Sequence, residues 1–299
     1  MSSLLYYALP ALGSYAVLSF FFLRRPWLLH APREPAFRCQ LVAHRGGSGE
    51  RLEHTIEAME NATAQRSDLF ELDCLLSRDG QVVVSHDENL FRQCGLNKNV
   101  GDIDFEDLPL YREKLEVYFS PGRFAQGSDR KMIRLEEIFQ KYPETPVSLE
   151  LKSENEELIT KIVALVKRFD RSEITIWAAE KNSVMKKCHA ANPEMPISFT
   201  QIRVVWLLFL YYMGLLPFFT LPERFLLCFL PTIINSLIMR KSLIRHLEER
   251  GIQVVFWCLN EESDFEVAYG LGATGVMTDY PTALRHYLDN HPQPTDRSN

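Results

Sequence analysis

Short apolar segments alternate with amphipathic helical patterns along most of this chain, and this alternation restricts the folds open to it. Strands that alternate with helices form parallel sheets covered by helices, so the order predicts an α/β fold. The predicted strands are 41–43, 69–75, 81–85, 146–151, 173–177, 196–200, 252–257 and 274–278. The predicted helices are 53–65, 134–141, 154–168, 181–191, 240–250, 261–270 and 281–289.

Eight strands with helical crossovers predict a TIM (β/α)8 barrel, a fold of ~250 residues. About 245 of the 299 residues lie outside three uncharged apolar runs, which is enough for one such domain. A doubly wound open sheet is the alternative, but no glycine-rich nucleotide loop follows the first strand. The polar segment 87–133 is too long for a simple crossover, and we interpret it as an excursion on the loop side.

The first apolar run, residues 4–23, is long enough to cross a bilayer. No basic residue precedes it and Arg24-Arg25 follows it, a pattern typical of an uncleaved anchor rather than a signal peptide. We therefore predict a membrane protein of the endoplasmic reticulum or another endomembrane. The arginines favour a cytosolic location for the chain after the anchor, with a lumenal one as the alternative. The predicted domains are an anchor and basic linker (1–39), a barrel (40–290) and a polar tail (291–299).

The second apolar region, residues 204–239, falls between predicted strands six and seven. It predicts a membrane-associating insert, with two buried core helices as the alternative. Its second half, 225–239, would be ~22 Å long as a helix, too short for a ~30 Å hydrocarbon core, so we expect shallow or re-entrant insertion. A loop after strand six emerges on the catalytic face of a barrel. Anchor and insert together are therefore expected to hold the active-site mouth against a bilayer.

Charged side chains occupy alternate positions on two predicted strands. Glu71 and Asp73 share one face of the first, and Glu150 and Lys152 share one face of the second. Charges on a solvated edge strand are the alternative, but barrel strands have no solvated face, so both sets are expected inside. Three inward carboxylates need a cation among them, and oxygen ligands select Ca²⁺ or Mg²⁺, with Ca²⁺ as our first choice.

Two histidines end predicted strands: His44, in His44-Arg45-Gly46-Gly47, and His86. Near a hard metal ion, with Arg45 and Lys152 close by, they compose a site for a phosphate ester. Arginine binds phosphate oxygens bidentately and lysine supplies a point charge. Histidines can deliver and remove protons near neutral pH, and His86 is a further candidate metal ligand.

In order, these motifs resemble those of the glycerophosphodiester phosphodiesterase family over residues 40–289. They are His44-Arg45-Gly46, Glu71-Leu72-Asp73, His86-Asp87, Leu149-Glu150-Leu151-Lys152, Trp257 and Thr278-Asp279-Tyr280-Pro281. The resemblance implies a TIM barrel with metal ligands, an acid–base pair and substrate-binding residues. The implied metal ligands are Glu71, Asp73 and Glu150, and the implied acid–base pair is His44 and His86. Arg45 and Lys152 would bind the phosphate, and Trp257 would lie on the glycerol or acyl side.

Two departures from the family pattern affect substrate positioning only. Glu53-His54-Thr55 has histidine where the family often has asparagine, and Trp257-Cys258-Leu259-Asn260 replaces the usual Trp-Thr-Val-Asn. The other histidines, His54 included, are interpreted as surface or packing residues. The six cysteines show no CxxC spacing and are expected to be free, buried thiols.

The anchor and apolar insert, added to the resemblance, predict a lysophospholipase D that cleaves lysophosphatidylcholine to lysophosphatidic acid and choline. Attack by a glycerol hydroxyl or by water are both compatible with the site. One alternative is hydrolysis of soluble glycerophosphodiesters to glycerol 3-phosphate and an alcohol; another is an inactive membrane scaffold. The net charge of −6 argues against nucleic acid as a partner. The expected partners are the lipid or glycerophosphodiester substrate and the bilayer.

Overall fold

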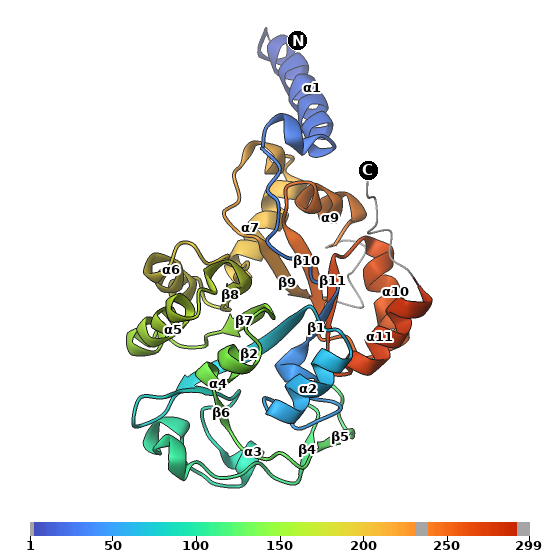
Figure 1. The fold of residues 1–299 in the computed structure, drawn as a ribbon. Helices are drawn as coiled ribbons and strands as arrows, with labels where there is room; N and C mark the ends of the chain where they lie inside the picture. The colour runs from blue at the N-terminus through green and yellow to red at the C-terminus, as the bar shows by residue number, and fades with distance from the viewer. Residues whose placement is uncertain (1–2, 231–238, 292–299) are drawn as a thin grey trace.

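The computed structural model describes residues 3–230 and 239–291, and parallel strands form its centre (Figure 1). These strands are β1 (Leu41–Ala43), β2 (Leu69–Leu76), β7 (Val147–Glu150), β8 (Thr175–Ala178), β9 (Phe225–Phe229), β10 (Gln253–Trp257) and β11 (Gly275–Thr278). β1 pairs with β2 and β11, β2 with β7, β7 with β8, and β10 with β9 and β11, all in parallel. Two single parallel bridges, at residues 197 and 198, link β8 to β9. The path of pairings thus returns to β1, and the α/β class is confirmed.

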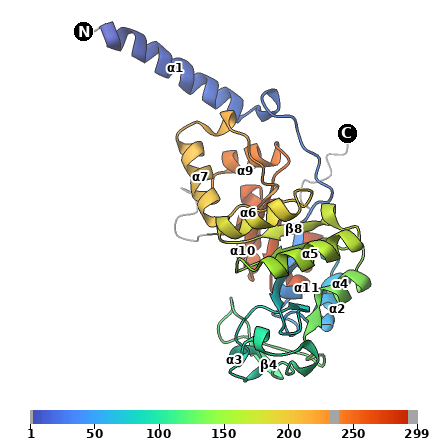
Figure 2. The same ribbon diagram turned by 90° about the vertical axis from the view of Figure 1, so that its left-hand side faces the viewer.

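Helices follow most of these strands and cover their outer faces (Figures 1 and 2). They are α2 (Ile56–Ala64), α4 (Leu135–Lys141), α5 (Glu156–Arg168), α6 (Asn182–Ala191), α7 (Gln201–Tyr212), α9 (Lys241–Glu248), α10 (Glu262–Leu271) and α11 (Pro281–Asn290). Helix α5 illustrates why: Asn155 caps its first turn by accepting from the Leu158 amide, and its apolar face, including Ile162 and Val166, is buried. All seven predicted helices are present, with ends shifted by a few residues.

Short 3₁₀ turns lie between these elements. They are η1 (Pro26–Leu28), η2 (His44–Gly46), η3 (Val100–Asp102), η4 (Phe105–Asp107), η5 (Ser172–Ile174) and η6 (Leu216–Phe218).

All six cysteines are free, as expected; four are buried, and Cys94 and Cys258 are partly exposed.

The predicted strand 81–85 exists but does not belong to the parallel set. As β3 (Val82–Val84) it pairs antiparallel with β2, and β6 (Ile133–Arg134) pairs antiparallel with β3. The cause is a tight turn after β2, in which Gly80 takes a φ of 77° and the Ser77 amide donates to the Gln81 carbonyl. Such a turn can join only antiparallel neighbours. The excursion 87–133 carries α3 (Phe91–Cys94) and a hairpin of β4 (Lys114–Glu116) and β5 (Phe124–Gln126).

Part of the predicted membrane insert 204–239 is instead a core strand. Residues 225–229 are β9, which pairs with β10 over its whole length, and Phe225 and Leu226 are buried. The run lacks charge because both faces of a parallel strand are covered, and composition alone does not separate this from lipid insertion. The alternative of two core helices is wrong for the same segment. Residues 231–238 lie outside the described part of the chain.

Helix α1 (Ser3–Leu23) projects from the domain, and among the described helices it alone is long and apolar enough to cross a membrane (Figure 1). Its end is held by the Ser19 hydroxyl, which donates to the Gly214 carbonyl at 2.7 Å, and by His246, whose Nδ1 lies 2.8 Å from the Leu23 carbonyl. His246 lies in α9, just before β10, so α1 meets the domain at the amino ends of the strands. The expectation that the anchor itself holds the active-site mouth to a bilayer is therefore wrong, because parallel strands place that mouth at the opposite end.

Candidate active site

Three carboxylates converge at the carboxyl ends of two neighbouring strands. The β2–β7 register sets Asp73 opposite Glu150, and Glu71 lies two residues before Asp73 on the same face. One oxygen from each carboxylate lies within 4.8 Å of the other two. Glu71 and Asp73 are each only 3% exposed. The predicted convergence of these side chains is thus present.

The charges of this cluster do not balance. Burial, and then the neighbouring Asp73 and Glu150, raise the pKa of Glu71 well above its usual value. Burial and Asp73 also raise the pKa of Glu150 to about 7. Burial opposes ionisation of Asp73 too, but the His54 hydrogen bond and the Lys152 charge hold its pKa well below the usual range. Three convergent carboxylate donors, two of them buried, with this surplus of negative charge fit a hard divalent cation.

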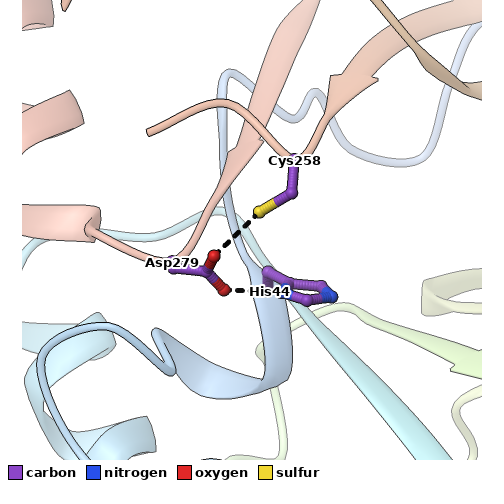
Figure 3. Close-up of side chains that lie close together, drawn as sticks. All are labelled: His44, Cys258 and Asp279. Atoms are coloured by element: carbon purple, nitrogen blue, oxygen red, sulfur yellow. Dashed lines mark hydrogen bonds and ion pairs between the residues drawn. The ribbon is translucent and has the colours of Figure 1, made fainter. Parts of the chain in front are cut away.

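The carboxylate of Asp279 holds the His44 ring through its Nδ1 atom (Figure 3). Its Nδ1 lies 2.6 Å from Asp279 Oδ1, while its Nε2 lies 3.9 Å from Glu71 Oε2. With Nδ1–H donating to Asp279, Nε2 is left to exchange a proton beside the acidic cluster. The cause of this placement is the β1–β11 pairing, which sets the ends of the two strands side by side.

Asp279 also accepts hydrogen bonds from other side chains. Ser48 donates to Oδ1 at 2.5 Å, and Asn260 and Cys258 donate to Oδ2 at 2.8 and 3.2 Å. Despite burial, His44, Ser48 and Asn260 lower the pKa of Asp279 to about 2, so it is ionised at neutral pH. His44, Cys258 and Asp279 could in principle bind a metal ion, but donors already occupy both carboxylate oxygens. We interpret the group as a network that positions His44.

Arg45 is buried next to the acidic cluster. It is 2% exposed, with Nη1 3.2 Å from Glu53 Oε2 and Nε 3.8 Å from Asp73 Oδ2. Glu53 is shared with Arg92, whose Nη2 lies 2.6 Å from Glu53 Oε1. Lys152 is more open, and its Nζ lies 3.0 Å from Asp73 Oδ1. Both predicted phosphate-binding cations therefore stand beside the carboxylates.

His54 is neither a surface residue nor a simple packing residue, contrary to expectation. It is fully buried, and its Nε2 lies 3.0 Å from Asp73 Oδ2. Its backbone has a φ of 58°, a left-handed conformation in which asparagine, aspartate and histidine are enriched among non-glycine residues. The histidine at this position thus holds one of the three carboxylates in place.

His86 does not join the carboxylate group, although it lies nearby. Its Nδ1 is 2.5 Å from Asp87 Oδ1, and its carbonyl accepts a hydrogen bond from Lys152 at 3.3 Å. The loop of the β4–β5 hairpin covers both histidines, because Tyr118 lies against His86 and Phe119 against His44, with ring centroids 5.8 and 5.5 Å apart.

A cavity of about 320 Å³ opens beside the carboxylates. His44, Glu71 and Glu150 line one end, and Trp257, a predicted substrate-binding residue, lines its wall. The rest of the wall is largely apolar and comes from the ends of β8, β9 and β10 and the start of α7. Trp257 packs against Phe229, with ring centroids 3.9 Å apart.

Residues 44–283 match the glycerophosphoryl diester phosphodiesterase family. The chain belongs to this family. It is 70% identical to human "Lysophospholipase D GDPD3", over 97% of this chain and 98% of that protein. It is 41% identical to human "Lysophospholipase D GDPD1", over 97% and 98% of the two chains.

Solved structures of the family share the fold at low sequence identity. The glycerophosphoryl diester phosphodiesterase domain of a Mycobacterium tuberculosis protein has a TM-score of 0.67 and 17% identity, covering 85% of this chain and 99% of that one. An Oleispira antarctica phosphodiesterase, solved with sn-glycerol-3-phosphate, has a TM-score of 0.63 and 21% identity, covering 84% and 97%. The neighbours thus place the domain in a known family fold.

Sequence reasoning assigned no role to several residues around the site. Asp279 carried a detectable signal, since it directly follows a strand, as His44 does. Glu53 lies in the Glu53-His54-Thr55 motif, but its pairing with Arg92 gave no signal, because it joins residues 39 positions apart. Tyr118 and Phe119 lie in an irregular hairpin loop whose position no periodicity predicts.

Proposed function

We propose that this chain is a divalent-cation-dependent lysophospholipase D that cleaves lysophospholipids such as lysophosphatidylcholine on the headgroup side of the phosphate. The observation that carries the proposal is the continuity between the cluster of three carboxylates, two of them buried, and a largely apolar cavity. The carboxylates suit a phosphodiester, and the cavity suits a lipid tail. The names of the two human relatives support the same substrate class.

Each group of side chains has its own role in the proposed reaction. Glu71, Asp73 and Glu150 would hold the cation, Ca²⁺ or Mg²⁺, which neutralises charge that grows on the phosphate oxygens. Arg45 and Lys152, which lie beside the carboxylates, would bind the phosphate oxygens. His44 accepts through Nε2 the proton of the attacking group, either water or the free glycerol hydroxyl, while Asp279 stabilises the imidazolium that forms. Attack by water gives lysophosphatidic acid directly, whereas attack by the glycerol hydroxyl gives a cyclic phosphate that water then opens. His86 donates a proton to the departing alcohol.

We also infer the organisation of the whole chain. Residues 1–39 are an anchor and linker, and 40–290 are a closed (β/α)8 barrel in which residues 196–200 act as the fifth strand and β9 as the sixth. The return of the strand pairings to β1 supports closure. The apolar anchor supports a membrane location, and we propose the endoplasmic reticulum or another endomembrane.

The proposed function is tested with the purified full-length protein in detergent. Lysophosphatidylcholine and glycerophosphocholine are supplied separately, with Ca²⁺, with Mg²⁺ and with EDTA, and released choline is measured. We expect lysophosphatidylcholine to be the better substrate and EDTA to abolish turnover of both. Faster cleavage of glycerophosphocholine would favour the soluble-substrate alternative. No turnover of either substrate with any cation would favour the scaffold.

The outer face of α7 is proposed to lie on the bilayer. Ile202, Val205, Trp206 and Phe209 are exposed there, whereas a helix facing water would carry polar residues on this side. Trp206 stacks on Phe209 with ring centroids 5.2 Å apart. Figure 2 shows α7 running along one side of the domain from the junction with α1.

Phe209→Glu is therefore expected to lower turnover of lysophosphatidylcholine in vesicles severalfold, because a carboxylate resists burial among lipid chains. Cleavage of glycerophosphocholine in solution should not change. The matched control is Val267→Glu on α10, since Val267 is 47% exposed and Phe209 46%. Equal activity of the two variants on vesicles would contradict the proposed contact between α7 and the bilayer.

A further inference from the structure

We propose that the apolar part of the cavity binds the acyl chain of the lysophospholipid and that Val204 of α7 limits its length. This inference rests on the proposed function and adds a position for the lipid tail. Phe199, Val204, Leu227 and Met239 line this part of the cavity, which we call the acyl arm. All four side chains are apolar, and the Met239 sulfur is at most a weak acceptor, so the arm suits a hydrocarbon.

The acyl arm and the acidic cluster lie in one continuous cavity. His44, Glu71 and Glu150 line its polar end, and the walls that carry the arm come from α7 and β9. A phosphodiester beside the carboxylates therefore has room for a tail in one direction, toward the start of α7. An enzyme for glycerophosphodiesters alone gains nothing from an apolar wall on that side.

A polar side chain beside the acidic cluster also lines the cavity, since the β2–β7 register sets Ser148 opposite Glu71. Ser148 is fully buried and lines the cavity, yet its hydroxyl has no hydrogen-bond partner in the described part of the chain. On β7 it lies two residues before Glu150, on the same face. A buried hydroxyl without a partner is costly, so it points to a ligand group that can pair with it. The free glycerol hydroxyl of a lysophospholipid lies between phosphate and acyl chain and meets this need.

The arrangement orients the substrate. His86, which is not among the residues that line the cavity, lies on the side of the hairpin loop with Tyr118. A lipid with its tail in the acyl arm directs its headgroup away from α7, toward His86. The leaving alcohol then departs beside a proton donor, while His44 stays on the glycerol side.

Two valines form a matched pair for the test. Val204 of α7 lines the cavity and is partly buried, whereas Val267 of α10 does not line it and is 47% exposed. We expect Val204→Trp to fill the arm and lower kcat/KM for palmitoyl-lysophosphatidylcholine at least tenfold. Cleavage of hexanoyl-lysophosphatidylcholine and glycerophosphocholine should stay within threefold of the wild type. Val267→Trp should leave all three substrates within threefold.

A graded series, Val204→Leu, Val204→Phe and Val204→Trp, should shorten the longest accepted chain step by step. Glycerophosphocholine turnover and the thermal unfolding midpoint report that each variant is folded. A Val204→Trp enzyme that keeps full activity on the palmitoyl lipid, or loses activity equally on all three substrates, would overturn the acyl arm alone. A wild-type enzyme that cleaves no lysophospholipid would overturn the proposed function and this inference together.

Discussion

Glu71→Gln should lower phosphodiester turnover on the order of 10³-fold while leaving the protein folded. The substitution keeps the shape of the side chain and an oxygen that can still accept from the Arg45 amide, a bond of 3.0 Å in the structure. It removes one of three anionic donors, so the cation is held more weakly and the phosphate charge is less well neutralised. Initial rates on lysophosphatidylcholine and glycerophosphocholine measure the loss, which should be similar for both substrates.

The folding of this variant can be checked independently of its activity. Because burial, and then Asp73 and Glu150, disfavour ionisation of Glu71, removing its charge should not lower the thermal midpoint of the metal-free protein. Glu136→Gln, on α4 and outside the site, is the control and should retain full turnover. If Glu71→Gln retains wild-type rates, the acidic cluster has no part in the chemistry.

Asp279→Asn should lower kcat on the order of 10²-fold or more with little change in KM. Asparagine can present its amide NH₂ to His44 Nδ1, which then becomes the acceptor and leaves Nε2 protonated and unable to take a proton. The carboxylate that would stabilise the imidazolium is also lost. Steady-state kinetics on lysophosphatidylcholine separate kcat from KM, and cation affinity should remain as in the wild type.

Cys258→Ala is the matched control for this network. It removes a thiol donor from the Asp279 Oδ2 atom but leaves both the carboxylate and the His44 contact intact. We expect a change of no more than a few-fold. Comparable losses in the two variants, or a loss confined to KM in Asp279→Asn, would argue against Asp279 as the group that positions His44.

The acidic cluster could be predicted from sequence because it depends on the most regular property of a strand. Alternate residues of a strand share a face, so Glu71 and Asp73 had to point together, and Leu72 had to point away. Glu150 followed from the same rule on a second strand. Pairing of β2 with β7 then brought the two sets side by side.

The predicted strand order was wrong where a local apolar pattern has more than one structural explanation. Val82–Val84 reads as a buried strand in either direction, and only the turn at Gly80 makes it antiparallel. Phe225–Phe229 is equally apolar as a core strand or as a lipid-facing segment. Neighbouring strands decide such cases, and a single sequence does not reveal them.

Residues that support the site were missed because their partners are distant in sequence. Asp279 is 235 positions from His44, and His54 contacts Asp73 from a loop rather than a strand. The docking site of α1 was missed for a similar reason. It depends on contacts such as Ser19 with Gly214, 195 positions apart, that no periodic pattern encodes.

The central claim, that Glu71, Asp73 and Glu150 together hold one divalent cation, is tested most directly by calorimetric titration of metal-free protein with Ca²⁺ and with Mg²⁺ at pH 8 and pH 6. The pKa of Glu150, raised to about 7, means that this group carries a proton at pH 6 that the cation must displace. We predict one bound equivalent, weaker binding at pH 6 than at pH 8, and proton release on binding. For the same reason the metal-free fold loses stability as the pH rises from about 4.5 to about 7, so the cation should raise the unfolding midpoint more at pH 8. Absence of binding at pH 8, or binding that Glu71→Gln leaves unchanged, would contradict the account.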